Sequence, residues 1–156
     1  MIVKLKLGLV AVLFLGTHAL PALAQFDALS IKADSAKMSD LSFVTEPLEL
    51  GRSSNIHNGL FKPAGVKPGE RYPALVLLHG CGGILPRQMR YWIESATSEG
   101  YVALVVDGMR GNKNNCFPPM PIPLGRRIKD AFDALAHLSG LSFVDPERIF
   151  AAGYSQ

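Results

Sequence analysis

The sequence predicts an α/β fold in which a mostly parallel sheet carries helices on its faces. Continuous apolar runs at residues 74–78 and 101–106 are typical of strands buried on both sides of a parallel sheet. An amphipathic helical pattern follows each run, and a third short strand is expected at residues 148–152. The order strand, helix, strand, helix, strand implies right-handed crossovers, and functional groups of such sheets gather at the carboxyl ends of the strands.

Each predicted helix has one apolar face and a glycine after its end. The first begins after Pro86 and stops before Gly100, and the second stops before Gly140. Between residues 41 and 60 a ragged alternation predicts one or two short strands. The residues expected to face the core are Met89, Trp92, Ile93 and Ala96 in the first helix, and Ile128, Ala131, Phe132, Leu135 and Ala136 in the second.

The first 24 residues have the pattern of a secretory signal peptide. Two lysines precede an apolar run that is too short to span a bilayer, and Ala22 and Ala24 give the small-x-small cleavage pattern. An amphipathic or membrane-anchoring helix is the alternative, but the order of charges and the small residues favour a signal peptide. We therefore expect a mature chain that begins at Gln25, is periplasmic or secreted, and has no stable membrane anchor.

The charge balance gives no indication of a nucleic-acid partner. The 156-residue chain has a formal net charge of +3, but cleavage after Ala24 would remove two basic and no acidic residues and leave 14 basic against 13 acidic. Residues 25–40 lack a clean period and are expected to form a lead-in segment. The 132 residues that follow Ala24 are enough for a moderate core, in one domain at most.

The third strand runs directly into Gly153, Tyr154, Ser155 and Gln156, four of the five positions of a G-x-S-x-G nucleophile turn. Such a turn holds a serine on a sharp strand-to-helix bend, where small residues two positions away avoid a backbone clash. A G-x-S-x segment alone occurs by chance in many proteins. Its place directly after a buried strand makes Ser155 the candidate nucleophile.

A second, independent motif follows the first strand. Acyl transfer needs two preorganised N–H donors where the tetrahedral intermediate carries its negative charge. One donor follows the nucleophile, and the other comes from a glycine-bearing loop after an upstream strand. The HGCGG segment at residues 79–83 fits that loop in residue type and location. We expect the backbone amides of Cys81 and Gln156 to form the oxyanion hole.

Other interpretations of these residues are weaker. A phosphate-binding loop would need a third glycine where Leu85 stands. His79 begins the oxyanion loop and is more often a packing residue there than a catalytic base, and Asp107 more often caps the loop that follows it. Cys81 as a nucleophile would compete with Ser155.

Cys81 and Cys116 are the two cysteines of the chain. In an oxidising compartment they can form one disulfide. Two buried free thiols are the equal alternative, because two cysteines alone do not establish a pair.

Three ordered motifs together resemble the dienelactone hydrolase family of α/β-hydrolases: LLHGCGG, YVALVVDGMRGNKNNC and DPERIFAAGYSQ. The resemblance covers roughly residues 73–156. It implies a central parallel sheet, a serine or cysteine nucleophile, here Ser155, and hydrolysis of small esters or lactones without a metal or organic cofactor. Arg110 falls where some relatives contact a substrate carboxylate.

In this fold the acid and histidine of the triad follow the nucleophile in the chain. We therefore expect an α/β-hydrolase-type sheet truncated after the nucleophile strand, so that residues 41–156 are the amino-terminal part of a hydrolase domain and the chain alone is inactive. A non-catalytic fragment or binding module is the alternative. A small nucleotide-binding domain is a third and weaker one.

Overall fold

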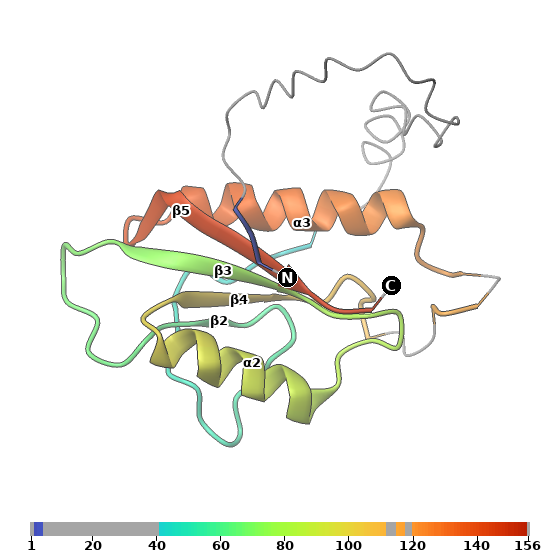
Figure 1. The fold of residues 1–156 in the computed structure, drawn as a ribbon, viewed down its shortest axis with the longest axis horizontal. Helices are drawn as coiled ribbons and strands as arrows, with labels where there is room; N and C mark the ends of the chain where they lie inside the picture. Colours follow the sequence, from blue (N-terminus) through green and yellow to red (C-terminus); the bar gives the residue numbers. More distant parts are fainter. Residues whose placement is uncertain (1, 5–40, 112–114, 118–119, 156) are drawn as a thin grey trace, which may run out of the picture.

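The computed structural model describes residues 2–4, 41–111, 115–117 and 120–155. They form a five-stranded sheet in the order β1-β5-β3-β4-β2, with two helices against it (Figure 1). The elements are β1 (Ile2–Lys4), β2 (Leu60–Phe61), β3 (Tyr72–Leu78), α2 (Pro86–Ser98), β4 (Val102–Val106), α3 (Leu124–Ser139) and β5 (Val144–Gly153).

The three central strands are parallel and the two edge strands are antiparallel to their neighbours. β3 pairs with β4 on one side and with β5 on the other, in a register that sets Leu78 opposite both Val106 and Gly153. β2 pairs antiparallel with β4, and β1 with β5. This mostly parallel sheet with flanking helices confirms the predicted fold class and is consistent with a partial α/β-hydrolase fold.

The two helices cover opposite faces of the sheet (Figure 1). Successive strand residues point to opposite faces, so Val76 and Leu104 pack in the cluster below α3, whereas Leu77 and Val105 pack with α2. The second crossover returns across β3 in the direction opposite to the first. Two right-handed crossovers therefore require helices on opposite faces.

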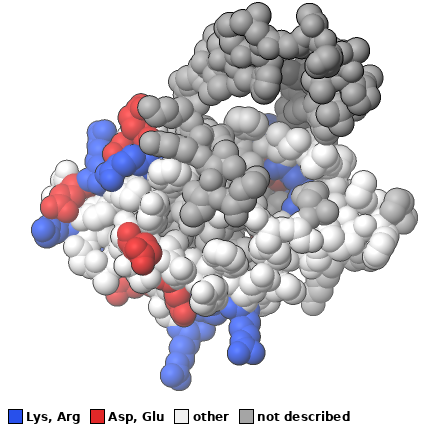
Figure 2. Space-filling view, in the orientation of Figure 1, with Lys and Arg blue, Asp and Glu red and all other residues white. Residues whose placement is uncertain are grey.

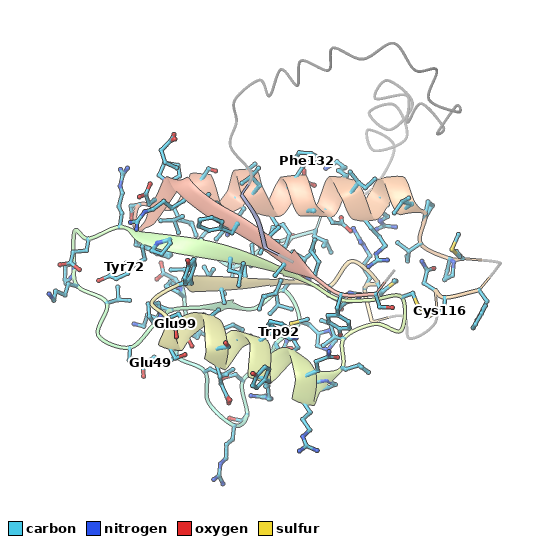
Figure 3. The ribbon with its side chains drawn as sticks, viewed as in Figure 1. Glu49, Tyr72, Trp92, Glu99, Cys116 and Phe132 are labelled. Atoms are coloured by element: carbon cyan, nitrogen blue, oxygen red, sulfur yellow. A yellow bond between two sulfur atoms is a disulfide. The ribbon has the colours of Figure 1, made fainter. Side chains whose placement is uncertain are left out.

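The buried face of α2 contains Met89, Ile93 and Ala96, as expected. Trp92 was expected beside them but is 38% exposed on the outer side of the helix (Figure 3). Its position one residue before Ile93 turns it about 100° away from that contact. The helical periodicity was predicted correctly, but the buried face of α2 is narrower than predicted because it does not include Trp92.

The predicted core face of α3 is partly wrong. Ala134, Leu135 and Leu138 are buried, whereas Phe132 is 57% exposed (Figure 3) and Ala136 is also exposed. Asp130, a carboxylate that was not expected in the core, is only 1% exposed. A buried ion pair, described below, accounts for it.

β5 begins earlier than predicted and contains an irregularity. Tyr72 pairs with Val144 and Ala74 pairs with Ile149, so residues 145–148 bulge out of the ladder. Asp145 accepts hydrogen bonds there from the Glu147 amide and the Arg148 side chain. The strand therefore begins at Val144, before the predicted residues 148–152, and continues past a bulge.

The amino-terminal strand β1 lies inside the predicted signal peptide. Ile2, Val3 and Lys4 pair with Ala152, Ala151 and Phe150 at the edge of β5. The remainder of that peptide and the predicted lead-in segment at residues 25–40 lie outside the described residues. Within the described residues, no helix is long and apolar enough to cross a membrane.

Side chains of opposite charge lie next to each other on the surface (Figure 2). Lys67 pairs with Glu70, and Arg148 pairs with Asp145. Both pairs are close in sequence and solvent-exposed, so each contributes little to stability.

Candidate active site

The candidate nucleophile Ser155 directly follows β5 at the carboxyl edge of the sheet. Its φ of 46° lies in the left-handed region, which few residues other than glycine adopt. Such strain is found where the surrounding structure enforces it, and functional sites are common examples. Gly153, two positions earlier, lies against β3, where a Cβ would come within 3.3 Å of the Leu78 Cβ. The local geometry is that of a sharp turn which exposes the serine.

The predicted oxyanion loop lies directly against this turn. A Cβ on Gly80 would lie 2.8 Å from the Ser155 carbonyl oxygen, 3.1 Å from the Tyr154 carbonyl oxygen and 3.2 Å from the Ser155 Cβ. The structure thus brings together two motifs that are 75 positions apart in the chain. The absence of a side chain at Gly80 is what permits the approach.

Hydrogen bonds hold the oxyanion loop in a tight turn. The Gly80 carbonyl accepts from the Gly83 N–H at 3.2 Å and from the His79 Nδ1–H at 2.8 Å. Since a carbonyl only accepts, Nδ1 must carry the proton. Within the described part of the chain, no acceptor is bonded to the Cys81 N–H. This amide is therefore the candidate oxyanion donor of the loop.

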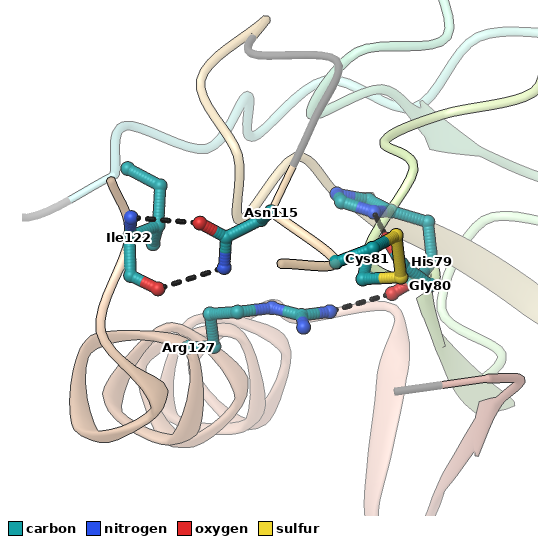
Figure 4. Close-up of a disulfide and its surroundings, with 7 residues drawn as sticks. His79, Gly80, Cys81, Asn115, Ile122 and Arg127 are labelled. Atoms are coloured by element: carbon teal, nitrogen blue, oxygen red, sulfur yellow. Dashed lines mark hydrogen bonds between the residues drawn. A yellow bond between two sulfur atoms is a disulfide. The ribbon is translucent and has the colours of Figure 1, made fainter. Parts of the chain in front are cut away.

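A disulfide joins the oxyanion loop to the segment after β4 (Figure 4). Cys81 and Cys116 are linked, and the Cys81 carbonyl accepts a 2.9 Å hydrogen bond from the Asn115 N–H. Asn115 is buried, and its side chain donates to the Ile122 carbonyl at 2.8 Å and accepts from the Ile122 N–H at 2.9 Å. The loop is therefore braced by a segment that is itself fixed.

Arg127 of α3 contacts the same loop from the other side (Figure 4). Its Nη2 donates to the His79 carbonyl at 2.6 Å. Burial lowers the pKa of Arg127, and the nearby Asp130 carboxylate opposes this effect. This contact was not predicted, because an arginine on an amphipathic helix gives no indication of a partner 48 residues away.

A largely apolar cavity of about 460 Å³ opens beside Ser155. Burial raises the pKa of Tyr154, which contributes to its wall. Arg127 is the charged residue that lines it within the described part of the chain. Its apolar walls come from β3, β5 and α3, with Leu78, Ile128, Ala131, Phe132, Leu135 and Ile149 among the lining residues.

Asp107 organises the end of β4, as expected for a residue that caps the loop after a strand. Its carboxylate accepts from the Met109 and Gly111 amides and from His57 Nδ1 at 2.7 Å. Burial alone would raise the pKa of Asp107, but the interactions with His79 and His57 outweigh it and hold that pKa well below its ordinary value. His57 and Asp107 are 50 positions apart, and no sequence pattern predicted that they would pair.

Arg110, which the resemblance placed at a substrate carboxylate, is held by the protein's own carboxylate. Its guanidinium makes a bidentate contact with Asp130, at 2.5 and 2.7 Å. Arg110 does not line the cavity beside Ser155. The Asp130 carboxylate can therefore be buried in α3 because the Arg110 guanidinium neutralises its charge.

The second oxyanion donor and the histidines complete the set of candidate catalytic groups. Gln156, the second expected oxyanion donor, lies outside the described residues. Within residues 2–4, 41–111, 115–117 and 120–155, no histidine nitrogen is hydrogen-bonded to Ser155: His57 contacts Asp107, His79 contacts Gly80, and His137 contacts Val44. No group of three or more potential metal ligands occurs in these ranges either.

No family model matches the chain. Among solved structures, it is similar to a thermophilic esterase from the planctomycete Thermogutta terrifontis with propionate bound. The identity is 27%, the match covers 61% of this chain and 35% of the esterase, and the TM-score is 0.47. Esterase 2 of the same organism, phosphorylated by paraoxon, matches at 28% identity over 60% of this chain and 36% of that chain, with a TM-score of 0.46. The chain thus spans about a third of the length of these esterases, and we base the function on the site itself.

Proposed function

We propose that this chain carries the nucleophile and the oxyanion loop of a serine hydrolase of the dienelactone hydrolase type, which cleaves small esters or lactones. The observation that carries the proposal is the close approach of Gly80 to a serine with a φ of 46° at the end of a central parallel strand. The sequence motif expected to stabilise the oxyanion, at residues 79–83, therefore lies against the motif that carries the candidate nucleophile Ser155.

In this mechanism the Ser155 Oγ attacks the carbonyl carbon of the ester. The carbonyl oxygen takes up negative charge in the tetrahedral intermediate and accepts hydrogen bonds from the Cys81 N–H and the Gln156 N–H. A general base must remove the hydroxyl proton, because a serine hydroxyl is a weak nucleophile at neutral pH. None of the described residues is assigned as this general base.

The proposed protein is exported, to the periplasm or the extracellular space. The Cys81–Cys116 disulfide supports this location, because disulfides persist in oxidising compartments and are rare in the cytosol. The signal-peptide pattern at the amino terminus supports it independently.

A non-catalytic binding or interaction module is the second candidate. It is favoured by the lack of a histidine hydrogen-bonded to Ser155 within the described ranges. Without an activating base, a serine retains only the weak catalysis that oxyanion binding provides.

Hydrolysis of p-nitrophenyl acetate separates the two candidates. We would assay the chain as given and the same chain continued through any open frame after codon 156, each with Ser155→Ala and with the exposed control Ser142→Ala. The hydrolase is supported if either chain turns over the ester, and if Ser155→Ala abolishes this turnover whereas Ser142→Ala preserves it. Turnover that is absent from both forms, or insensitive to Ser155→Ala, supports the non-catalytic module.

A further inference from the structure

The orientation of the Cys81 amide is set by the carbonyl on the same peptide unit. In a trans peptide the C=O and the following N–H point in opposite directions. The Gly80 carbonyl accepts two hydrogen bonds, from His79 Nδ1 and the Gly83 amide, on one side of the loop. These two bonds favour a Cys81 N–H that points to the other side, but both are made within residues 79–83 and do not tie the loop to the rest of the fold.

Two further restraints act on Cys81 itself, and both come from the segment after β4. The Asn115 N–H bonds the Cys81 carbonyl at 2.9 Å, and the disulfide to Cys116 fixes the side chain (Figure 4). Asn115 is only 3% exposed, and its side chain is locked to the Ile122 backbone. The restraint on Cys81 therefore comes from a turn that the Asn115 side chain closes with two hydrogen bonds to Ile122.

The disulfide is also within reach of solvent. Cys116 is exposed and Cys81 is partly exposed, whereas Asn115 beside them is buried. Exposed disulfides are the labile class that reductants can attack, in contrast with structural disulfides of a core. A redox switch needs a disulfide that restrains the functional site and that a reductant can reach. The Cys81–Cys116 disulfide meets both requirements.

We infer that the Cys81–Cys116 disulfide positions the oxyanion-hole peptide and makes the site competent only in the oxidised state. This inference rests on the proposed function. A dithiol attacks one sulfur of the bond and displaces the other. It supplies two electrons and two protons and becomes a disulfide itself, and it leaves two cysteine thiols. Cys81 keeps its amide but loses the covalent restraint on its direction.

The test compares amide hydrogen exchange in the oxidised chain, the chain reduced with dithiothreitol, and the variant Cys116→Ser. We expect exchange at residues 80–83 to rise about tenfold in the reduced chain and in Cys116→Ser, while α2 and β4 are unchanged. Phe117→Ala, which alters a 75% exposed neighbour and keeps the disulfide, should match the parent chain. Dithiothreitol should have no further effect on Cys116→Ser.

Kinetics provide a second measurement that a merely structural role would not alter. In the form that shows Ser155-dependent turnover, loss of the disulfide should lower kcat roughly 100-fold, the typical effect of losing one oxyanion donor, with little change in KM. Reoxidation should restore kcat. Unchanged exchange at residues 80–83, exchange that rises equally in every element, or a kcat that survives reduction would overturn the inference. A chain with no Ser155-dependent turnover, but with the expected exchange response, overturns the proposed function and leaves the restraint on the loop established.

Discussion

Gly80 and Ser155 are in backbone contact, although neither belongs to a helix or strand that would force them together. The Ser155 carbonyl oxygen lies 2.8 Å from the point where a Gly80 Cβ would be. β3 and β5 are hydrogen-bonded neighbours up to the pair Leu78 and Gly153. The loops that follow β3 and β5 therefore lie against each other. Gly80 permits this close packing because it has no side chain.

Gly80→Ala should destabilise the fold and displace Ser155. The new methyl group meets two backbone carbonyls and the Ser155 Cβ, none of which is the flexible end of a side chain. We expect a loss of about 1–3 kcal/mol in the free energy of unfolding, measured by urea denaturation.

Gly82→Ala in the same loop is the matched control. A Cβ there meets nothing within 4 Å, and the backbone is not left-handed. We expect its free energy of unfolding to equal or slightly exceed that of the parent chain. Equal losses in the two variants would mean that Gly80 is needed for loop flexibility and not for the contact.

The buried pair of Arg110 and Asp130 gives a second prediction. Asp130→Asn removes the charge that neutralises a mostly buried guanidinium. Breaking such a pair from one side typically costs about 3 kcal/mol or more, because the remaining charge is uncompensated. Thermal and urea unfolding should both register the loss.

Asp133→Asn, on the same helix, is the control for this prediction. Asp133 pairs with Lys129 one turn away, and its side chain is 30% exposed. Pairs of this kind contribute at most about 1 kcal/mol. A loss for Asp133→Asn as large as that for Asp130→Asn would contradict a special role for the buried pair.

The sequence could predict the central elements and the place of the candidate nucleophile at a strand end, because these depend on local patterns. The apolar runs that became β3 and β4 are buried from both sides, and only a central parallel strand has that environment. The loop at His79 and the turn at Ser155 were located from strand ends, since a parallel sheet places all such ends at one edge.

The partners that brace the site could not be predicted, because each depends on contacts between distant segments. The bond from Arg127 to the His79 carbonyl and the side-chain pairing of His57 with Asp107 leave no periodic signal. The same limit explains the error in α3. Asp130 was not among the expected core residues, because a carboxylate adds nothing to an apolar pattern and its partner Arg110 lies 20 positions away.

Asn115→Ala should be costly although Asn115 touches no substrate. The buried amide side chain satisfies both the N–H and the carbonyl of Ile122. Its removal leaves two backbone groups without partners, and each such group costs about 1–3 kcal/mol when buried. Asn115→Asp retains an acceptor but replaces the donor with an acidic oxygen that faces the Ile122 carbonyl in a buried site, so its unfolding free energy should be at least as low as that of Asn115→Ala. An alanine variant as stable as the parent would show that water replaces the side chain.

Asp107 should make the stability of the fold depend on pH in the acid range. Burial raises its pKa, but the interactions with His79 and His57 prevail, so the folded-state pKa lies well below the unfolded value of about 4. The unfolded chain therefore binds a proton that the folded chain does not bind as the pH falls through this range. The stabilisation is fully present above the unfolded pKa and is lost progressively below it. Urea unfolding of the parent and of Asp107→Asn at pH 7, 5, 4 and 3 measures this, and the difference between them should shrink as the pH falls below about 4. A difference that is constant or grows over that range would mean that the Asp107 carboxylate is not stabilised by its histidine neighbours.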